Sequence, residues 1–165
     1  INNHHNYVTR SVSTIEHHLE KVITAHGVKH PQLIKIKTSF DAVKEELIAH
    51  MQKEEKMLFP YIINMKTAIQ HSMKMNCASF GSVNNPIKVM ENEHEEAGKR
   101  MAEISLLSNR YTPPENACNT FKVLYSELKE FEQDLHQHVH LENNILFPKA
   151  VEMEKELNAP SCSLS

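Results

Sequence analysis

Glycine and long apolar runs are scarce in this 165-residue chain, and each scarcity excludes a class of structure. There are only three glycines, and the β-branched runs that mark strands are absent, whereas Lys, Glu, Met and Leu are plentiful. This composition favours helix. No apolar stretch approaches the roughly 18 residues that are needed to span a bilayer, and no signal peptide is visible. We therefore expect an all-α protein with no membrane partner.

Cysteine is also rare, and charge of neither sign dominates. Cys77, Cys118 and Cys162 form no C-x-x-C motif and no pairing pattern, which favours a reducing cytoplasm as the location. The net charge is −3, without a basic face, so no nucleic-acid partner is expected. The length fits one domain with a sizeable core. We assign residues 1–157 to this domain and 158–165 to a C-terminal tail.

Histidine, in contrast, is abundant, with 12 residues, and some of it belongs to a repeated motif. The pattern His-x-x-x-Glu-x-x-x-Leu-Phe-Pro occurs twice, 88 residues apart, and begins at His50-x-x-x-Glu54 and at His138-x-x-x-Glu142. On an α-helix, residues four apart lie on the same face, one turn apart. Each copy therefore directs one imidazole and one carboxylate towards a common point.

Hydrophobic periodicity predicts four amphipathic helices, over about 3–26, about 31–65, from residue 86, and after a capping box at Thr112-Pro-Pro-Glu115. The link between the first two helices and that between the last two are short, which favours an up-down-up-down four-helix bundle. The longer segment 66–85 is expected to be a loop. The apolar stripes continue through Met57 and Tyr61 in the second helix and through Ile145 in the fourth.

One in-phase histidine on each helix falls at a similar height in such a bundle: His5, His50, His94 and His138, near its lower end. His26 is also in phase, but it is 21 residues from His5, or about 31 Å along a straight helix, so it cannot reach the same centre. We assign it a structural role near the turn. His4 is the competitor to His5, because it too lies one turn before Val8.

Four histidines and two glutamates suit iron or manganese, with zinc possible, and helix bundles can hold pairs of carboxylate-bridged metals. The predicted ligands are therefore His5, His50, Glu54, His94, His138 and Glu142, with the two glutamates bridging two iron ions and an oxo or hydroxo group between them. An open position could accept O₂ or NO. The alternatives are a zinc or structural-metal site and a plain bundle with polar core residues. No nucleophile–base pair or phosphate loop is present, so no catalytic residue is assigned. Any catalysis would be redox chemistry at the metals, such as reduction of NO.

The residues around these ligands resemble those of a known family. The segments His50-Met-Gln-Lys-Glu54-Glu-Lys-Met-Leu-Phe-Pro, Glu93-His94-Glu-Glu-Ala-Gly98 and His138-Val-His-Leu-Glu142-Asn-Asn-Ile-Leu-Phe-Pro resemble the hemerythrin-like domain of the RIC (repair of iron centres) di-iron proteins. The resemblance covers about residues 4–150. It implies protection from nitrosative and oxidative stress, reaction with NO, and supply of iron to damaged iron–sulfur proteins. It also implies the same six metal ligands.

The resemblance leaves a second function open, and the sequence departs from the family pattern in two ways. A hemerythrin-type oxygen carrier or sensor commonly has a fifth histidine one turn from the third-helix ligand, but Met90, Glu91, Ala97 and Gly98 occupy those positions here. Full-length RIC proteins usually carry a small N-terminal domain with a cysteine pair, which this sequence does not include. The 66–85 loop is longer than usual, and we expect either a lid or iron exit route beside the metals or a solvated insertion. We also expect the Leu-Phe-Pro triplets to pack over the metals and each proline to kink its helix.

Overall fold

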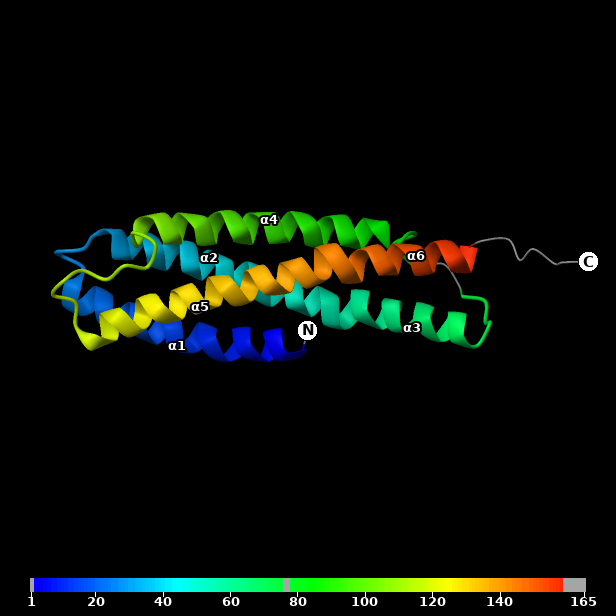
Figure 1. Cartoon of the computed structure of the whole chain (residues 1–165), viewed down its shortest axis with the longest axis horizontal. Coiled ribbons are helices and arrows are strands. Elements are labelled where there is room, and N and C mark those ends of the chain that lie inside the picture. The colour runs from blue at the N-terminus through cyan, green and yellow to red at the C-terminus, as the bar shows by residue number, and fades with distance from the viewer. Residues whose placement is uncertain (1, 76–77, 159–165) are drawn as a thin grey trace, which may run out of the picture.

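The computed structural model describes residues 2–75 and 78–158, and these form four long helices (Figure 1). The helical segments are α1 (Asn2–His26), α2 (Gln32–Lys53), α3 (Phe59–Gln70), α4 (Asn84–Leu107), α5 (Asn119–Leu141) and α6 (Phe147–Asn158). Two π-helical turns, η1 (Glu54–Leu58) and η2 (Glu142–Leu146), join α2 to α3 and α5 to α6 without a break. No helix in the described ranges is both long and apolar enough to cross a membrane.

The four helices pack as a bundle in which chain neighbours run in opposite directions. Helix α1 contacts α2 and α5, and α4 contacts the same two helices from the other side, while α3 packs against α6. The all-α, up-down-up-down bundle that the periodicity predicts is therefore confirmed. Helix α1 ends just before Gly27, a position that suits only glycine, because a Cβ there would lie 2.5 Å from the carbonyl oxygen of Ile23, closer than real contacts allow.

The first helix is much shorter than the molecule, and this divides the core in two. In Figure 1 the first turn of α1 lies midway along the long axis, and α3, α6 and the start of α4 continue beyond it. The larger core cluster, built around Leu19, Phe40 and Phe131, fills the four-helix part. A smaller cluster, built around Leu58, Met90 and Phe147, fills the part beyond α1. On the other three long helices the predicted ligands fall between the two clusters, so they lie mid-molecule. Helix α1 has no residue in the smaller cluster, and only there does the predicted ligand lie at the end of the helix, as expected.

The two π-helical turns lie directly before the prolines of the repeated motif. The backbone N–H of Phe59 donates to the carbonyl of Glu54, and that of Phe147 donates to the carbonyl of Glu142, five residues back in each case. Pro60 and Pro148 follow in the next turn, where a proline can bond to no preceding carbonyl. A kink was expected at each proline. The structure has a turn with one extra residue just before it, and the helix continues through that turn.

That extra residue moves the buried stripe by one position. The periodicity predicts Met57 and Tyr61 in the core, but Met57 is 37% exposed and Tyr61 is half-buried, whereas Leu58 and Ile62 are buried. In the fourth helix Ile145 is 42% exposed and Phe147 is buried. The prediction was wrong at these positions because a constant 3.6-residue period does not hold through a π-helical turn.

The ends of several helices also differ from those predicted. The second helix continues to Gln70, and α4 begins at Asn84, two residues before the predicted start, with Val83 in the cap position. The Asn85 side chain donates to the carbonyl of Phe80 at 2.8 Å. The capping box at Thr112 opens no helix; α5 begins only at Asn119. A residue before proline avoids the helical region, and Thr112-Pro-Pro contains two such positions in a row.

The connection between α3 and α4 lies far from the ligands. Gln70 is 16 residues beyond Glu54, about 24 Å of helix, and Asn84 is ten residues before His94, about 15 Å. The end of the connection is attached to α6, where Glu154 accepts hydrogen bonds from the Ser82 hydroxyl at 2.6 Å and the Val83 backbone N–H at 2.7 Å. The expectation of a lid beside the metals is therefore wrong. Asn76 and Cys77 of this loop, and the expected tail after Asn158, lie outside the described residues.

Candidate metal centre

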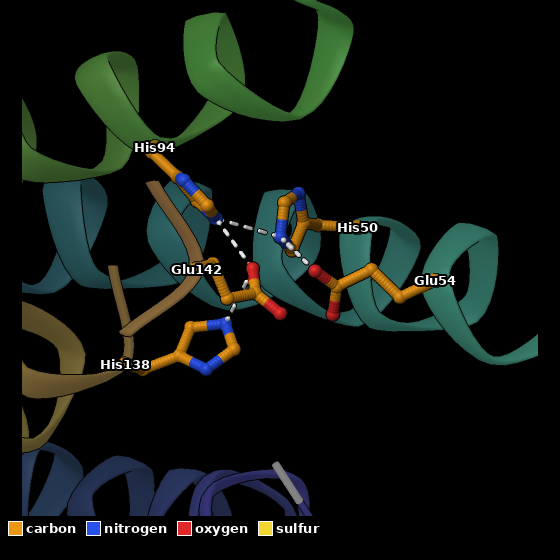
Figure 2. A group of neighbouring side chains, drawn as sticks. All are labelled: His50, Glu54, His94, His138 and Glu142. Atoms are coloured by element: carbon orange, nitrogen blue, oxygen red, sulfur yellow. Dashed lines mark hydrogen bonds and ion pairs between the residues drawn. The ribbon is translucent and has the colours of Figure 1, made fainter. Parts of the chain in front are cut away.

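Five of the six predicted ligands meet at one point in the middle of the bundle. Figure 2 shows their side chains converging from α2 and η1, from α4, and from α5 and η2. Each offers one ligand atom, and these atoms all lie within 4.8 Å of one another. All five side chains are buried; they are His50, Glu54, His94, His138 and Glu142. The sequence repeat thus corresponds to one shared centre.

The Nε2 atoms of the three histidines face the two carboxylates. The Nε2 atoms of His50 and His94 are 3.0 Å apart. His50 Nε2 lies 3.2 Å from Glu54 Oε1, and His94 Nε2 lies 3.4 Å from Glu142 Oε2. His138 Nε2 approaches the same Glu142 oxygen at 3.3 Å. Two nitrogens bound at right angles to one ion, each about 2.1 Å away, would be separated by about 3 Å, which is the spacing of the His50–His94 pair.

The sixth predicted ligand, His5, is not part of that five-residue group but touches it. Its Nε2 lies 3.0 Å from Glu54 Oε2, and the ring is 6% exposed. His5 therefore faces the carboxylate oxygen that His50 does not use. The two oxygens of Glu54 point towards two different histidines, as expected of a carboxylate that bridges two ions.

His4, the competing residue, is also buried, but its orientation differs. Its ring is stacked on that of His138, with centroids 3.8 Å apart and planes 7° apart. The lone pair of an imidazole nitrogen lies in the ring plane, so two nearly parallel stacked rings cannot both direct lone pairs at one ion. The ring of His5 makes an angle of 66° with that of His138, which permits a common ligand direction. This geometry favours His5 over His4.

Three of the histidines are held from behind by hydrogen bonds at Nδ1. The partners are Glu55 for His5 at 2.7 Å, Glu93 for His50 at 2.9 Å and Asn143 for His94 at 2.9 Å. An acceptor at Nδ1 keeps the proton there and leaves Nε2 free to bind a metal. Sequence reasoning did not single out these three partners. The available signal was their position next to Glu54, His94 and Glu142 in the chain.

Several polar atoms inside the centre have no hydrogen-bond partner. They are Oε1 of Glu54, Nε2 of His138 and both carboxylate oxygens of Glu142. Leaving such atoms unpaired in a protein interior costs several kcal/mol each, more for charged groups. Four unsatisfied acceptor-type atoms that face one another are what a cation site requires, so the side chains present fit a metal centre.

The charges inside the centre are compatible with a bound cation. Burial, together with the neighbouring Glu54, raises the pKa of Glu142 to about 10. Burial acts in the same direction on Glu54, but the hydrogen bond from His5 and the nearby imidazole of His50 outweigh it and hold the pKa of Glu54 well below its usual range. Burial lowers the pKa of His94 to about 4, with help from His50, and that of His138 to about 2, with help from His4. Burial thus keeps the imidazoles of His94 and His138 uncharged, whereas the neighbouring Glu54 outweighs burial and raises the pKa of His5 and of His50. Glu54 is ionised, and a metal would replace the proton on Glu142.

The Leu-Phe-Pro triplets cover the centre as expected. The Phe147 ring is stacked on His94, with centroids 6.1 Å apart and planes 4° apart, and Phe59 lies 5.9 Å from His5. Leu58 and Phe147 are fully buried. On the side of His5 and Glu55 the centre borders a surface cavity of about 250 Å³, which Thr9 and Met51 help to line.

The remaining histidines lie away from the centre. His26 is at the opposite end of α1 from His5, as the length of that helix requires. Its Nε2 lies 3.2 Å from the Cys118 thiol. His18 pairs with Glu127 at 2.7 Å on the bundle surface, and His17 is exposed. His136 and His140, which flank His138, are exposed as well.

Comparison with known proteins also indicates a cation-binding site. Residues 1–150 match the family model described as "Hemerythrin HHE cation binding domain". The chain is 41% identical over 135 residues to "Iron-sulfur cluster repair protein YtfE" of Yersinia pseudotuberculosis, covering 82% of this chain and 55% of that protein. It is 40% identical over 137 residues to the protein of the same name from Pectobacterium atrosepticum, covering 83% and 52%.

The chain spans about half the length of these curated relatives. The family match, in contrast, covers most of this chain, including all the residues of the centre. The chain belongs to the hemerythrin HHE cation binding domain family.

Proposed function

We propose that His5, His50, Glu54, His94, His138 and Glu142 bind two iron ions, with an oxo or hydroxo bridge between them. The arrangement of the donors supports this assignment. The two oxygens of Glu54 face His50 and His5. The closely spaced Nε2 atoms of His50 and His94 would share one ion, which leaves His5 and His138 for the other. Mixed imidazole and carboxylate donors suit iron or manganese. The unpartnered atoms of Glu142 and His138 are the observation that carries the proposal.

We further propose that the protein acts in repair of iron–sulfur clusters, and so protects against nitrosative and oxidative stress. It would react with NO or donate iron to damaged iron–sulfur proteins in the cytoplasm. The name of the curated relatives supports this role. When bound, the two ions supply redox chemistry and sites for small ligands such as NO and O₂. The chain's own residues would hold the ions, exclude water with Leu58 and Phe147, and admit small molecules through the cavity beside His5.

Reversible oxygen binding is the alternative function, and the surroundings of His94 argue against it. The positions one turn away are Met90 and Ala97, which are buried in the two apolar clusters, and Glu91 and Gly98. None can add a fifth imidazole, whereas oxygen carriers of the hemerythrin type are expected to have one. A centre with fewer nitrogen ligands is expected to hold its iron less firmly, which suits donation better than carriage.

The test is to load the protein with ferrous iron without oxygen and measure iron content and the absorption spectrum. Two irons per chain are expected, with an oxo-bridge band after oxidation. The loaded protein is then mixed with an iron–sulfur enzyme that NO has inactivated, and recovery of that enzyme is measured. Recovery that depends on the bound iron supports repair. A stable oxygenated form that releases O₂ reversibly, without recovery of the damaged enzyme, would instead support the oxygen carrier.

A further inference from the structure

His138 differs from the other three histidines of the centre in what holds it. His5, His50 and His94 each have a hydrogen-bond acceptor at Nδ1. Among the described residues the structure shows no hydrogen bond at either ring nitrogen of His138. A histidine ligand without such a partner is free to rotate about its side-chain bonds, and that rotation would lower its affinity for a metal.

The ring of His4 instead contacts the face of the His138 ring. It lies flat on His138, with centroids 3.8 Å apart and planes 7° apart. His4 is itself fixed, because its Nδ1 is hydrogen-bonded to Asp134, one turn before His138 on α5. Only 6% of His4 is exposed. The three side chains therefore form a compact unit that joins the start of α1 to α5.

We propose that His4, anchored by Asp134, is a positioning residue that holds His138 by ring stacking where the other histidines are held by hydrogen bonds. This inference rests on the proposed di-iron centre. It gives a role to a buried histidine that the six-ligand set does not use. It also explains why His4 can be so close to the centre and yet be oriented so that it cannot share an ion with His138.

The two ion positions are then held unequally. On one side, His50 and His94 are both held at Nδ1, by Glu93 and Asn143. On the other side, His5 is held by Glu55, whose side chain is 58% exposed, and His138 is held only through the stack. The second side also borders the surface cavity at His5. The ion beside His5 and His138 is therefore the one expected to leave first.

The test compares variants of the iron-loaded protein in a chelator challenge that follows iron release over time. For His4→Ala, we expect one of the two irons to leave about 10- to 100-fold faster than in the parent, the range found when supporting partners of metal ligands are lost. The other iron should leave at the parent rate. His4→Phe keeps a flat ring on His138 without the bond to Asp134, and it should restore most of the retention.

His18→Ala is the matched control. His18 also joins α1 to α5 through a carboxylate, since its Nδ1 lies 2.7 Å from Glu127. It is 14 residues from His4, about 21 Å along α1. This variant removes a similar histidine–carboxylate bridge between the same helices, and it should release both irons at the parent rate. Mössbauer spectra provide a second measurement: one of the two iron signals should change in His4→Ala and neither should change in His18→Ala.

Three outcomes distinguish a failure of the positioning role from a failure of the proposed di-iron centre. If His4→Ala retains both irons as His18→Ala does, the positioning role is refuted while the di-iron centre stands. If His4→Ala binds only one iron at saturation and His5→Ala binds two, His4 is a ligand and the inference is overturned. If the parent protein itself does not bind two irons, the proposed function fails before the role of His4 is tested.

Discussion

At the scale of single residues, the two buried carboxylates of the centre should respond differently to the same substitution. Glu54 is ionised, accepts a hydrogen bond from His5 and faces His50 Nε2 at 3.2 Å, whereas burial keeps the proton on Glu142. Glu54→Gln would remove charge-assisted hydrogen bonds and should destabilise the metal-free protein by about 2–4 kcal/mol. Glu142→Gln resembles the protonated side chain and should cost less than about 1 kcal/mol.

Urea unfolding of the two metal-free variants would measure this difference. Both variants should also lose metal, because a neutral amide replaces an anionic ligand. Equal destabilisation by the two substitutions would contradict the assignment of the proton to Glu142. Unchanged iron content in either variant would contradict its role as a ligand.

Sequence alone was enough to predict which side chains meet at the centre but not the residues that orient them. The repeated motif contains His50, Glu54, His138 and Glu142. His94 is added because its position along its helix places it at the same height in the bundle. The sequence places both His4 and His5 one turn before an apolar helix face, so His4 competes with the predicted ligand His5, and the ring orientations favour His5. Glu55, Glu93 and Asn143 look like ordinary surface residues in the sequence, because nothing in a helical period indicates which exposed side chain reaches a neighbouring helix.

At the scale of the elements, the π-helical turns explain why the periodicity predicted the fold but misplaced the core beyond each motif. Up to Glu54 and Glu142 the buried positions follow a regular helix, as in Val43, Leu47 and His50. Beyond them the buried positions come one residue later, at Leu58 and Ile62. A π-helical turn behaves as a one-residue insertion, and its sequence signal is the proline six residues after each glutamate.

Deletion of Met57 should therefore be tolerated better than deletion of a residue from a regular helix. Met57 is exposed and lies within η1, so its removal would convert the turn to α-helix and leave Leu58, Ile62 and Met65 facing the core. Circular dichroism should show retained helix and a cooperative melt. Iron content should fall, since Glu54 begins the turn.

Deletion of Glu45 is the control for this prediction. Glu45 is exposed in the regular part of α2, and its loss would rotate one side of the helix by about 100° relative to the other. This variant should not fold. Similar behaviour of the two deletions would show that the π-helical turn does not absorb the extra residue.

At the scale of the whole molecule, the centre joins two cores of unequal size. The larger cluster belongs to four helices, and the smaller one belongs to α3, α6 and the start of α4. The polar centre lies between them and contributes unpaired atoms unless a cation is bound. Metal binding should therefore stabilise the folded protein, by roughly 4 kcal/mol at a free metal concentration 1,000 times the dissociation constant. For a chain of this size that corresponds to about 10 °C in the melting temperature.

Chelation should not loosen the two parts of the molecule equally. The four-helix part keeps its large apolar core when the metal is removed, whereas the part beyond α1 has only three helical segments and the smaller cluster to hold it. Local opening is easiest where few buried apolar contacts must be broken. Amide hydrogen exchange should therefore accelerate more in α3 and α6 than in α1 and the first half of α5.

The Phe147→Leu variant tests whether this difference comes from the small cluster or from the metal alone. Phe147 belongs to that cluster and stacks on His94, so its loss weakens the region beyond α1 directly. In the metal-bound form, exchange in α6 should rise in this variant. Phe131→Leu, placed in the large cluster, should leave α6 unchanged. Uniform acceleration of exchange along all four helices on chelation would instead mean that the bundle opens as one cooperative unit, with the metal stabilising both cores alike.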